Sequence, residues 1–146
     1  PFGSTHHSDF QFTGIHVHQN WDGSIELDQT KYVEDIPHIE VPRDRRQTQD
    51  SLVSESERQS LRVLVGSLQY AATNTRPDIS AKLSLLQAKI NSACVKDLLD
   101  ANRLLTETKQ YKNTKIPIKS IPLEDVLHSQ MQPSPIEPTP NPKRGV

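Results

Sequence analysis

The sequence has little of the apolar and aromatic material that a domain of its length normally uses. Hydrophobic residues make up 33% and aromatic residues 5% of its 146 positions, whereas the apolar share of a typical domain is roughly 45–50%. Glycine is also scarce: eleven prolines outnumber five glycines, and six of the prolines lie between Pro122 and Pro142. We therefore expect a folded part followed by a disordered, proline-rich tail.

Other absences exclude whole classes of protein. The single cysteine, Cys94, excludes a disulfide framework and any cysteine-rich zinc module. No apolar run approaches the ~18 residues that cross a membrane, so we expect no membrane partner. There is no glycine-rich phosphate loop, and no acid–base or nucleophile set is forced to converge. The sequence therefore predicts no catalytic residue of its own.

Histidines are the one candidate set of metal ligands. His16 and His18 fall on one strand face and lie close in sequence to His6, His7 and Asp9. Their spacing matches no zinc signature, so we interpret them as exposed strand histidines and predict no metal site.

The net charge of −1 hides an asymmetry. Residues 1–50 carry four basic and nine acidic side chains, a balance of −5, whereas residues 51–121 carry eleven basic and six acidic side chains, a balance of +5. A basic half is typical of a chain that binds a polyanion. Solvated charges on helix surfaces explain the same numbers at least as well.

The first forty residues favour strands. The stretch from Phe10 to His18 alternates apolar and polar side chains and changes phase near Gly14, which predicts one half-buried strand with a bulge or a close backbone approach. Asp22-Gly23 is a favoured two-residue turn, so we expect a β-hairpin over about 10–29. A short helix follows, capped by Asp28 or Thr30 and stopped by Pro37.

The middle of the chain favours helices. Ser54 and Glu57 have the spacing of a capping box, and the periodicity predicts helices at about 54–73, 77–91 and 94–111, the last capped at Asn91-Ser92. The first buries one stripe, made of Leu61, Leu64, Val65, Leu68 and Ala72. Arg76-Pro77-Asp78 is expected to be structural, with Arg76 bridging to a neighbouring carboxylate.

These elements predict an α+β fold with a β-hairpin and short helix, a three-helix bundle and a tail. The polar segment 40–53 reads as a linker loop with few anchors, so the hairpin and the bundle need not pack firmly together. Residues 115–118 could start another strand, but nothing after them is available for pairing. Residues 126–146 lose all periodicity and are expected to be disordered.

Two blocks, taken in order, carry the most specific signal. The first combines Phe10-Gln-Phe-Thr-Gly-Ile-His-Val-His18 with the turn, Ile25-Glu-Leu-Asp-Gln29 and Tyr32-Val-Glu-Asp-Ile36. The second is LRVLVGSLQYAATNTRPDI at 61–79. Both resemble copia-type retrotransposon reverse transcriptases, which have an F-x-G-I strand, a hairpin, L-x-Q and Y-I/V-x-x-I, and then a thumb segment R-x-L-V-G-S-L-x-Y-x-x-x-x-T-R-P-D-I. The resemblance covers about residues 10–111.

The resemblance implies a piece of a polymerase without its catalytic centres. Residues 1–39 would be the end of the palm, 54–112 a thumb-like bundle, and 113–125 the start of a connection to RNase H. The family's Y-x-D-D hairpin, whose aspartates bind Mg²⁺, does not occur here, so we expect no cofactor in this fragment and no activity from it alone. The chain opens on Pro1 and is expected to be an internal piece; a frameshift or aberrant splice would explain residues 126–146.

The resemblance also implies a site. Thr13, Gly14, Ile15 and His16 would correspond to the primer grip, and Arg62, Gly66 and Tyr70 to the thumb face that follows the minor groove of the template–primer. The expected partners are an RNA–DNA or DNA duplex, bound weakly and without sequence preference, and the missing palm and RNase H domains. By resemblance the protein would be intracellular, in a cytoplasmic virus-like particle or the nucleus.

Two alternatives stay open. Gly66 could be a helix–helix contact and Tyr70 a core aromatic, because helical stripes are usually packing. The whole chain could instead be a non-catalytic helical module for protein interaction, with a proline-rich tail that docks on an aromatic groove.

Overall fold

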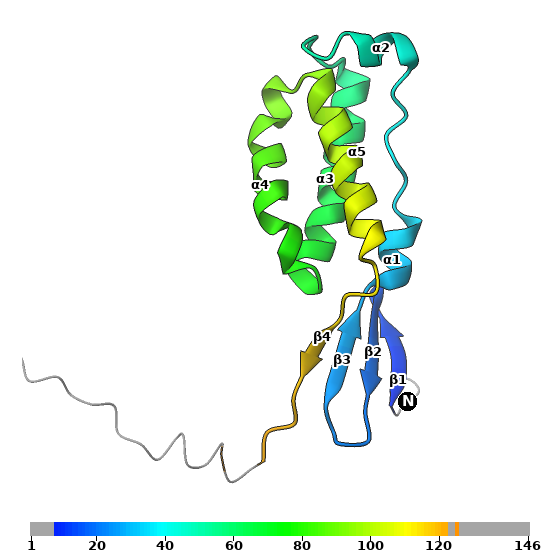
Figure 1. The fold of residues 1–146 in the computed structure, drawn as a ribbon, viewed down its shortest axis with the longest axis vertical. Coiled ribbons are helices and arrows are strands. Elements are labelled where there is room, and N and C mark those ends of the chain that lie inside the picture. The colour runs from blue at the N-terminus through cyan, green and yellow to red at the C-terminus, as the bar shows by residue number, and fades with distance from the viewer. Residues whose placement is uncertain (1–7, 123–124, 126–146) are drawn as a thin grey trace, which may run out of the picture.

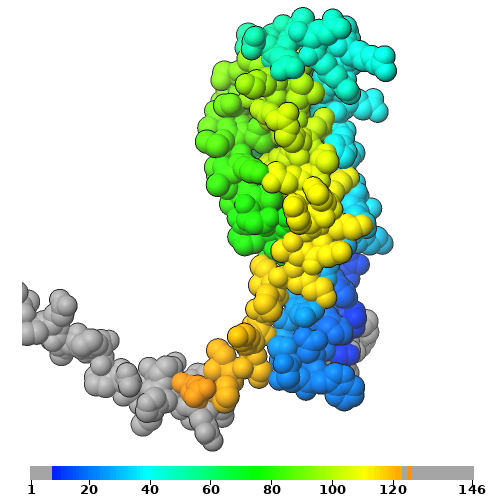
Figure 2. All heavy atoms as spheres, in the orientation of Figure 1, coloured from blue at the N-terminus to red at the C-terminus, as the bar shows by residue number. Residues whose placement is uncertain are grey.

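Strands and long helices occupy separate parts of the chain in the computed structural model, which describes residues 8–122 and 125 (Figure 1). The architecture is α+β, as predicted: a four-stranded antiparallel sheet in the order β1-β2-β3-β4 lies below a bundle of long helices. Figure 2 shows an elongated molecule in which the sheet projects from one end of the helical part. The predicted proline-rich tail lies outside the described residues.

Three of the four strands come from the predicted hairpin region. They are β1 (Asp9–Phe12), β2 (Ile15–Gln19) and β3 (Ile25–Asp28). The prediction of one bulged strand over 10–18 was wrong, because the chain reverses at Thr13-Gly14 and Phe12 pairs with Ile15. Both turn residues have positive φ, +49° and +83°, which is the backbone of the tightest hairpin turns. The change of phase at Gly14 therefore marks a chain reversal.

The second hairpin also differs from the prediction of a two-residue Asp22-Gly23 turn. The Asn20 N–H donates to Ser24 O at 2.8 Å, and the Gly23 N–H donates to Asn20 O at 3.0 Å. Gly23 has φ +80°. These bonds define a three-residue loop in which glycine takes the left-handed position after a tight turn.

The fourth strand, β4 (Ile116–Ile118), corrects a further expectation. The prediction sought a partner after residue 118, but β4 pairs backward with β3, where Leu27 lies opposite Ile116 and Ile25 opposite Ile118. An ion pair between Lys115 Nζ and Glu26 at 2.7 Å reinforces this contact. The chain that follows the bundle of long helices thus returns to the sheet and forms its edge strand next to β3.

The bundle follows the predicted periodicity closely. Its helices are α3 (Glu55–Asn74), α4 (Ser80–Lys89) and α5 (Val95–Gln110), with 3-10 turns at Pro77–Ile79 and Ile90–Ser92 on either side of α4. The capping box between Ser54 and Glu57 is confirmed. The cap of α5 is Cys94, whose N–H donates to Asp97 Oδ2 at 2.8 Å, and so the expected cap at Asn91-Ser92 was wrong.

The core lies almost wholly in this bundle. All five residues of the predicted α3 stripe are buried, together with Ile79 from the 3-10 turn before α4 and with Leu83, Leu98, Ala101 and Leu105 from the other two helices. Arg76 is 2% exposed and donates to both carboxylate oxygens of Asp78 and to the main-chain oxygens of Thr108 and Tyr111. The predicted bridge of Arg76 is therefore confirmed, and it ties the start of α4 to the end of α5.

The segment between the hairpin and the bundle is better anchored than expected. After α1 (Thr30–Asp35) the chain forms α2 (Arg43–Gln47) at the far end of the bundle (Figure 1). Val41 and Val53 are buried in the core, and Arg45 forms an ion pair with Glu57 at 2.7 Å. The description of this segment as a loop with few anchors was wrong, because isolated valines and an arginine give no periodic signal.

Candidate functional site

The turn between β1 and β2 rests against helix α3. The Tyr70 hydroxyl donates to the main-chain oxygen of Thr13 at 2.6 Å and lies 3.2 Å from its Oγ1. The rings of Tyr32, from α1, and Tyr70 pack in an edge-to-face arrangement with 5.2 Å between their centroids. A Cβ on Gly14 would lie 3.5 Å from the Tyr32 ring. Three of the predicted site residues, Thr13, Gly14 and Tyr70, therefore meet around Tyr32.

Tyr32 is a member of this cluster that sequence reasoning did not single out. Its hydroxyl donates to the main-chain oxygen of Ser67 at 3.2 Å, so the side chain bridges α1 and α3. Its position just after the hairpin, in a chain with three tyrosines, is a signal that could have marked it.

Ile15 and His16, the other two predicted hairpin residues, lie on opposite faces of the sheet because side chains alternate along a strand. Ile15 belongs to an apolar face that, among the described residues, is only half-buried or exposed, with Phe12 at 66% exposure. By register this face comprises Phe10, Phe12, Ile15, Val17, Ile25, Leu27, Ile116 and Ile118. A single ligand on one face of the sheet cannot reach both predicted residues.

His16 lies on the polar face between two carboxylates. Its Nε2 is 2.7 Å from Asp9 Oδ1, and its Nδ1 is 3.0 Å from Asp28 Oδ2. The hydrogen bonds with Asp28 and then Asp9 raise the pKa of His16. Burial alone would raise the pKa of Asp28, but its bonds with His16 and Thr30 lower it. The ion pairs of this cluster link β1, β2 and β3, because Asp9, His16 and Asp28 each come from a different strand.

The polar cluster borders a cleft of about 480 Å³ that Gly14 and His16 both line, along with residues of β3 and α1. Within residues 8–122 and 125, no group of three or more His, Cys, Asp or Glu side chains is arranged to hold a metal ion. His6 and His7 lie outside this part of the chain.

Gly66 and Arg62 lie further along α3 on the same helical stripe as Tyr70. Gly66 is exposed, and a Cβ built on it would meet nothing within 4 Å. The interpretation of Gly66 as a helix–helix contact was therefore wrong for the described chain. Tyr70 is half-buried but is not part of the buried core, so it is not a core aromatic either. Arg62 forms an exposed ion pair with Glu55 at 3.2 Å.

The positive charge of residues 51–121 is largely neutralised by local partners. Eight of its eleven basic side chains form ion pairs, namely Arg58, Arg62, Arg76, Lys82, Lys89, Arg103, Lys112 and Lys115. Arg76 is buried, but the other seven basic side chains are exposed or half-buried, and ion pairs of this kind exchange partners at little cost. The excess of basic residues in 51–121 is therefore distributed over separate ion pairs.

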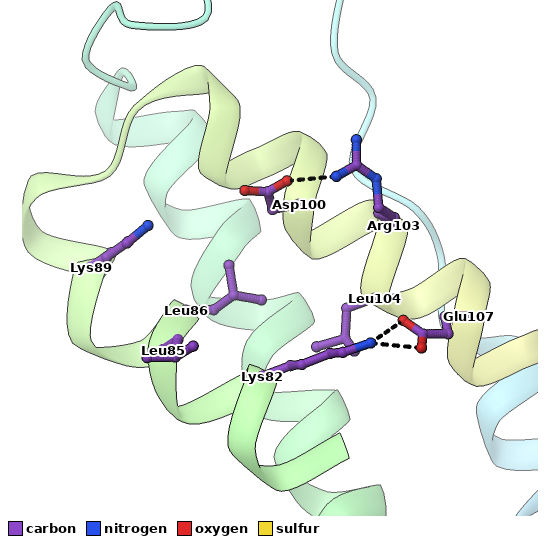
Figure 3. A pocket seen from close by; sticks show the side chains of 8 residues that line it. All are labelled: Lys82, Leu85, Leu86, Lys89, Asp100, Arg103, Leu104 and Glu107. Atoms are coloured by element: carbon purple, nitrogen blue, oxygen red, sulfur yellow. Dashed lines mark hydrogen bonds and ion pairs between the residues drawn. The ribbon is translucent and has the colours of Figure 1, made fainter. Parts of the chain in front are cut away.

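A separate groove lies between α4 and α5 (Figure 3). Its volume is about 300 Å³, and Leu85, Leu86 and Leu104 form its apolar floor. Ion pairs between Lys82 and Glu107 and between Arg103 and Asp100 border it. None of the predicted site residues lines this groove.

Comparisons of the chain with known protein families, with curated proteins and with solved structures found no match. None of the helices in the described part of the chain is both long and apolar enough to span a bilayer.

Proposed function

We propose that this chain is a fragment of a copia-type retrotransposon reverse transcriptase that holds the template–primer duplex but lacks the polymerase and RNase H active sites. In this proposal the helices α3, α4 and α5 form the thumb, and the Thr13-Gly14 turn belongs to the primer grip. The Mg²⁺ of the parent polymerase would be held by the missing palm, so this fragment binds without catalysis.

The observation that supports the proposal best is the exposed glycine in the middle of α3. Glycine inside a helix costs about 1 kcal/mol relative to alanine, and no neighbour of Gly66 requires the small residue. An exposed glycine leaves the helix backbone open to close approach by a flat surface. The sugar-phosphate edges along a minor groove are such a surface, and Gly66 lies in the 61–79 block that carries the resemblance.

The binding would be weak and independent of sequence. Arg62 reaches phosphate only by leaving Glu55, and both side chains are exposed, so the exchange is feasible but adds little affinity. Contacts to sugar and phosphate position a duplex without reading bases. We therefore expect affinity that falls as salt concentration rises.

The test is to add bulk at Gly66. Gly66→Leu is expected to weaken binding to an RNA–DNA hybrid on the order of tenfold, because the leucine separates the two surfaces and forfeits their close contacts. Ala88→Leu, on the exposed surface of α4, is the matched control and should leave affinity unchanged. Fluorescence anisotropy with a labelled hybrid measures affinity, and thermal unfolding measures stability. Equal affinities for wild type and Gly66→Leu would refute the proposal.

A second comparison isolates the charge. Arg62→Gln should reduce the slope of log affinity against log salt by about 1, as expected for one lost phosphate contact. Arg103→Gln is the control, because Arg103 is also an exposed arginine with a carboxylate partner, Asp100, but lies on α5. The proposal predicts a flatter salt dependence for Arg62→Gln only.

The α4–α5 groove favours the second candidate, a protein-interaction module without catalysis. Leu85, which is 69% exposed, lines this groove together with Leu86 and Leu104, so the groove offers an apolar surface that suits a protein partner. In this case Leu85→Ser would abolish capture of a protein partner and Gly66→Leu would not. If Gly66→Leu lowers the affinity for the RNA–DNA hybrid and Leu85→Ser does not, the result supports the first candidate, the duplex-binding fragment.

A further inference from the structure

Tyr70 is occupied by protein contacts on two sides. Its hydroxyl donates to Thr13 O at 2.6 Å, and its ring packs against the Tyr32 ring in an edge-to-face arrangement at an interplanar angle of 68°. Tyr32 is in turn fixed to α3 through Ser67 O. A tyrosine held in this way contributes more by fixing what it touches than by offering a free ring face to a ligand.

The turn that Tyr70 holds is a strained one. Thr13 has φ +49°, and a β-branched residue in the left-handed region is a genuine outlier. Such a conformation persists only where the surroundings determine it. Besides the pairing of Phe12 with Ile15 across the turn, Tyr70 supplies two contacts at this point, to the main-chain oxygen and to Oγ1 of Thr13.

We propose that Tyr70, supported by Tyr32, is a positioning residue that locks the Thr13-Gly14 turn at a fixed distance from the Gly66 surface of α3. This inference rests on the proposed function, because it assigns the pair to the same duplex. Gly66 precedes Tyr70 by one helical turn, about 6 Å along the axis at 1.5 Å per residue. A duplex that touches Gly66 and the turn together gains affinity only if the two points are held in register before it binds.

The experiment removes one oxygen atom and keeps the ring. In full-length Tyr70→Phe, amide exchange at Gly14 and Ile15 should become faster, and affinity for an RNA–DNA hybrid should fall roughly two- to tenfold, the range expected for one lost hydrogen bond. Tyr111→Phe is the control, since Tyr111 is exposed and its hydroxyl has no hydrogen-bond partner among the described residues. The melting temperature should change little in either variant.

A second variant tests the strain directly. Asparagine adopts the left-handed region more readily than threonine, so in a Thr13→Asn background the exchange at Gly14 should depend less on the Tyr70 hydroxyl. Unchanged exchange in Tyr70→Phe would overturn the inference, and so would faster exchange with unchanged affinity. If the wild-type chain does not bind the hybrid, the proposed function fails, and the exchange measurements alone still decide whether Tyr70 holds the turn.

Discussion

The bundle and the sheet differ in what holds them together. The largest fully buried apolar side chains include five leucines, Leu61, Leu68, Leu83, Leu98 and Leu105, and all belong to the bundle. In the part of the chain that the structure describes, none of the residues of β1 to β4 belongs to the apolar core. The sheet is instead held by its ladder, by His16 between two carboxylates, by the Lys115–Glu26 pair and by Tyr70.

This difference teaches where stability and adaptability are located. Apolar burial contributes free energy without demanding direction, whereas exposed polar contacts contribute little each and depend on pH and salt. We therefore expect the bundle to be the stable part of the molecule and the sheet to be the part that opens first. The proposed duplex site lies where the two regions meet, at Thr13 and Tyr70.

The largest effect should come from a cavity in the bundle. Leu98 is 0% exposed, and Leu98→Ala is expected to lower the free energy of unfolding by about 2–5 kcal/mol. Leu27→Ala, in the half-buried face of the sheet, should cost only about 1 kcal/mol because less of its side chain leaves water on folding. Urea unfolding followed by circular dichroism measures both. Equal losses would show that the sheet is not the weaker region.

Acid should lower the free energy of unfolding by a smaller amount, through an ion pair at the start of α3 in the bundle. The hydrogen bond with Arg45 lowers the pKa of Glu57 from its ordinary 4.5 to about 2. The stabilisation is therefore fully present above pH 4.5 and is lost as pH falls toward 2. Glu57→Gln should cost about 1–2 kcal/mol at pH 6 and much less at pH 2.5. Glu55→Gln, at an exposed neighbour, is the control for urea unfolding at the two pH values.

A gain of stability is expected at Gly66. Because a Cβ there meets no atom within 4 Å, Gly66→Ala should raise the free energy of unfolding by about 0.5–1 kcal/mol through helix propensity alone. The hybrid affinity should fall less than in Gly66→Leu, since a methyl group is smaller. A lower melting temperature for Gly66→Ala would mean that the helix backbone at this point has a constraint that the open surroundings do not reveal.

The sequence predicted the bundle better than it predicted the sheet. The helices, their buried stripes and the capping box at Ser54 were predicted, because a repeat every three to four residues reports directly on one buried face. The sheet was predicted only in part. A period-two pattern does not distinguish a bulge from a reversal at Thr13-Gly14, and the return of β4 to β3 depends on contacts 89 residues apart, as between Lys115 and Glu26.

The candidate site was also predicted only in part. Thr13, Gly14 and Tyr70 meet in the structure, and Tyr32 packs against them, but only the folded arrangement of α1 beside α3 shows that Tyr32 contacts Tyr70. Ile15 and His16 were predicted together from one run of sequence and lie on opposite faces of the sheet. Proximity in a strand predicts proximity in space only for every second residue.

The smallest effect on global stability should come from base, and it belongs to the sheet. The pKa of His16 is raised above its ordinary 6.5 by Asp28 and Asp9, so the stabilisation is fully present below pH 6.5 and is lost as pH rises through the folded-state pKa. The pKa values of Asp9 and Asp28 are lowered, so their contribution is lost only in acid, below about pH 3.8.

The sheet should be most ordered between about pH 3.8 and the raised pKa of His16. Amide protection factors on β2 and β3, measured at pH 5.5 and 8.5, test this expectation. At pH 8.5, after correction for the intrinsic exchange rate, the wild-type sheet should lose protection, while the bundle keeps its protection because its core side chains are apolar. His16→Gln should start lower and show no further loss. His38→Gln is the control, since His38 forms a hydrogen bond with Thr106 and has no ion pair with a carboxylate among the described residues. Loss of protection in both regions together would mean that the sheet and the bundle open as one cooperative unit, which the exposed, polar character of the His16 cluster argues against.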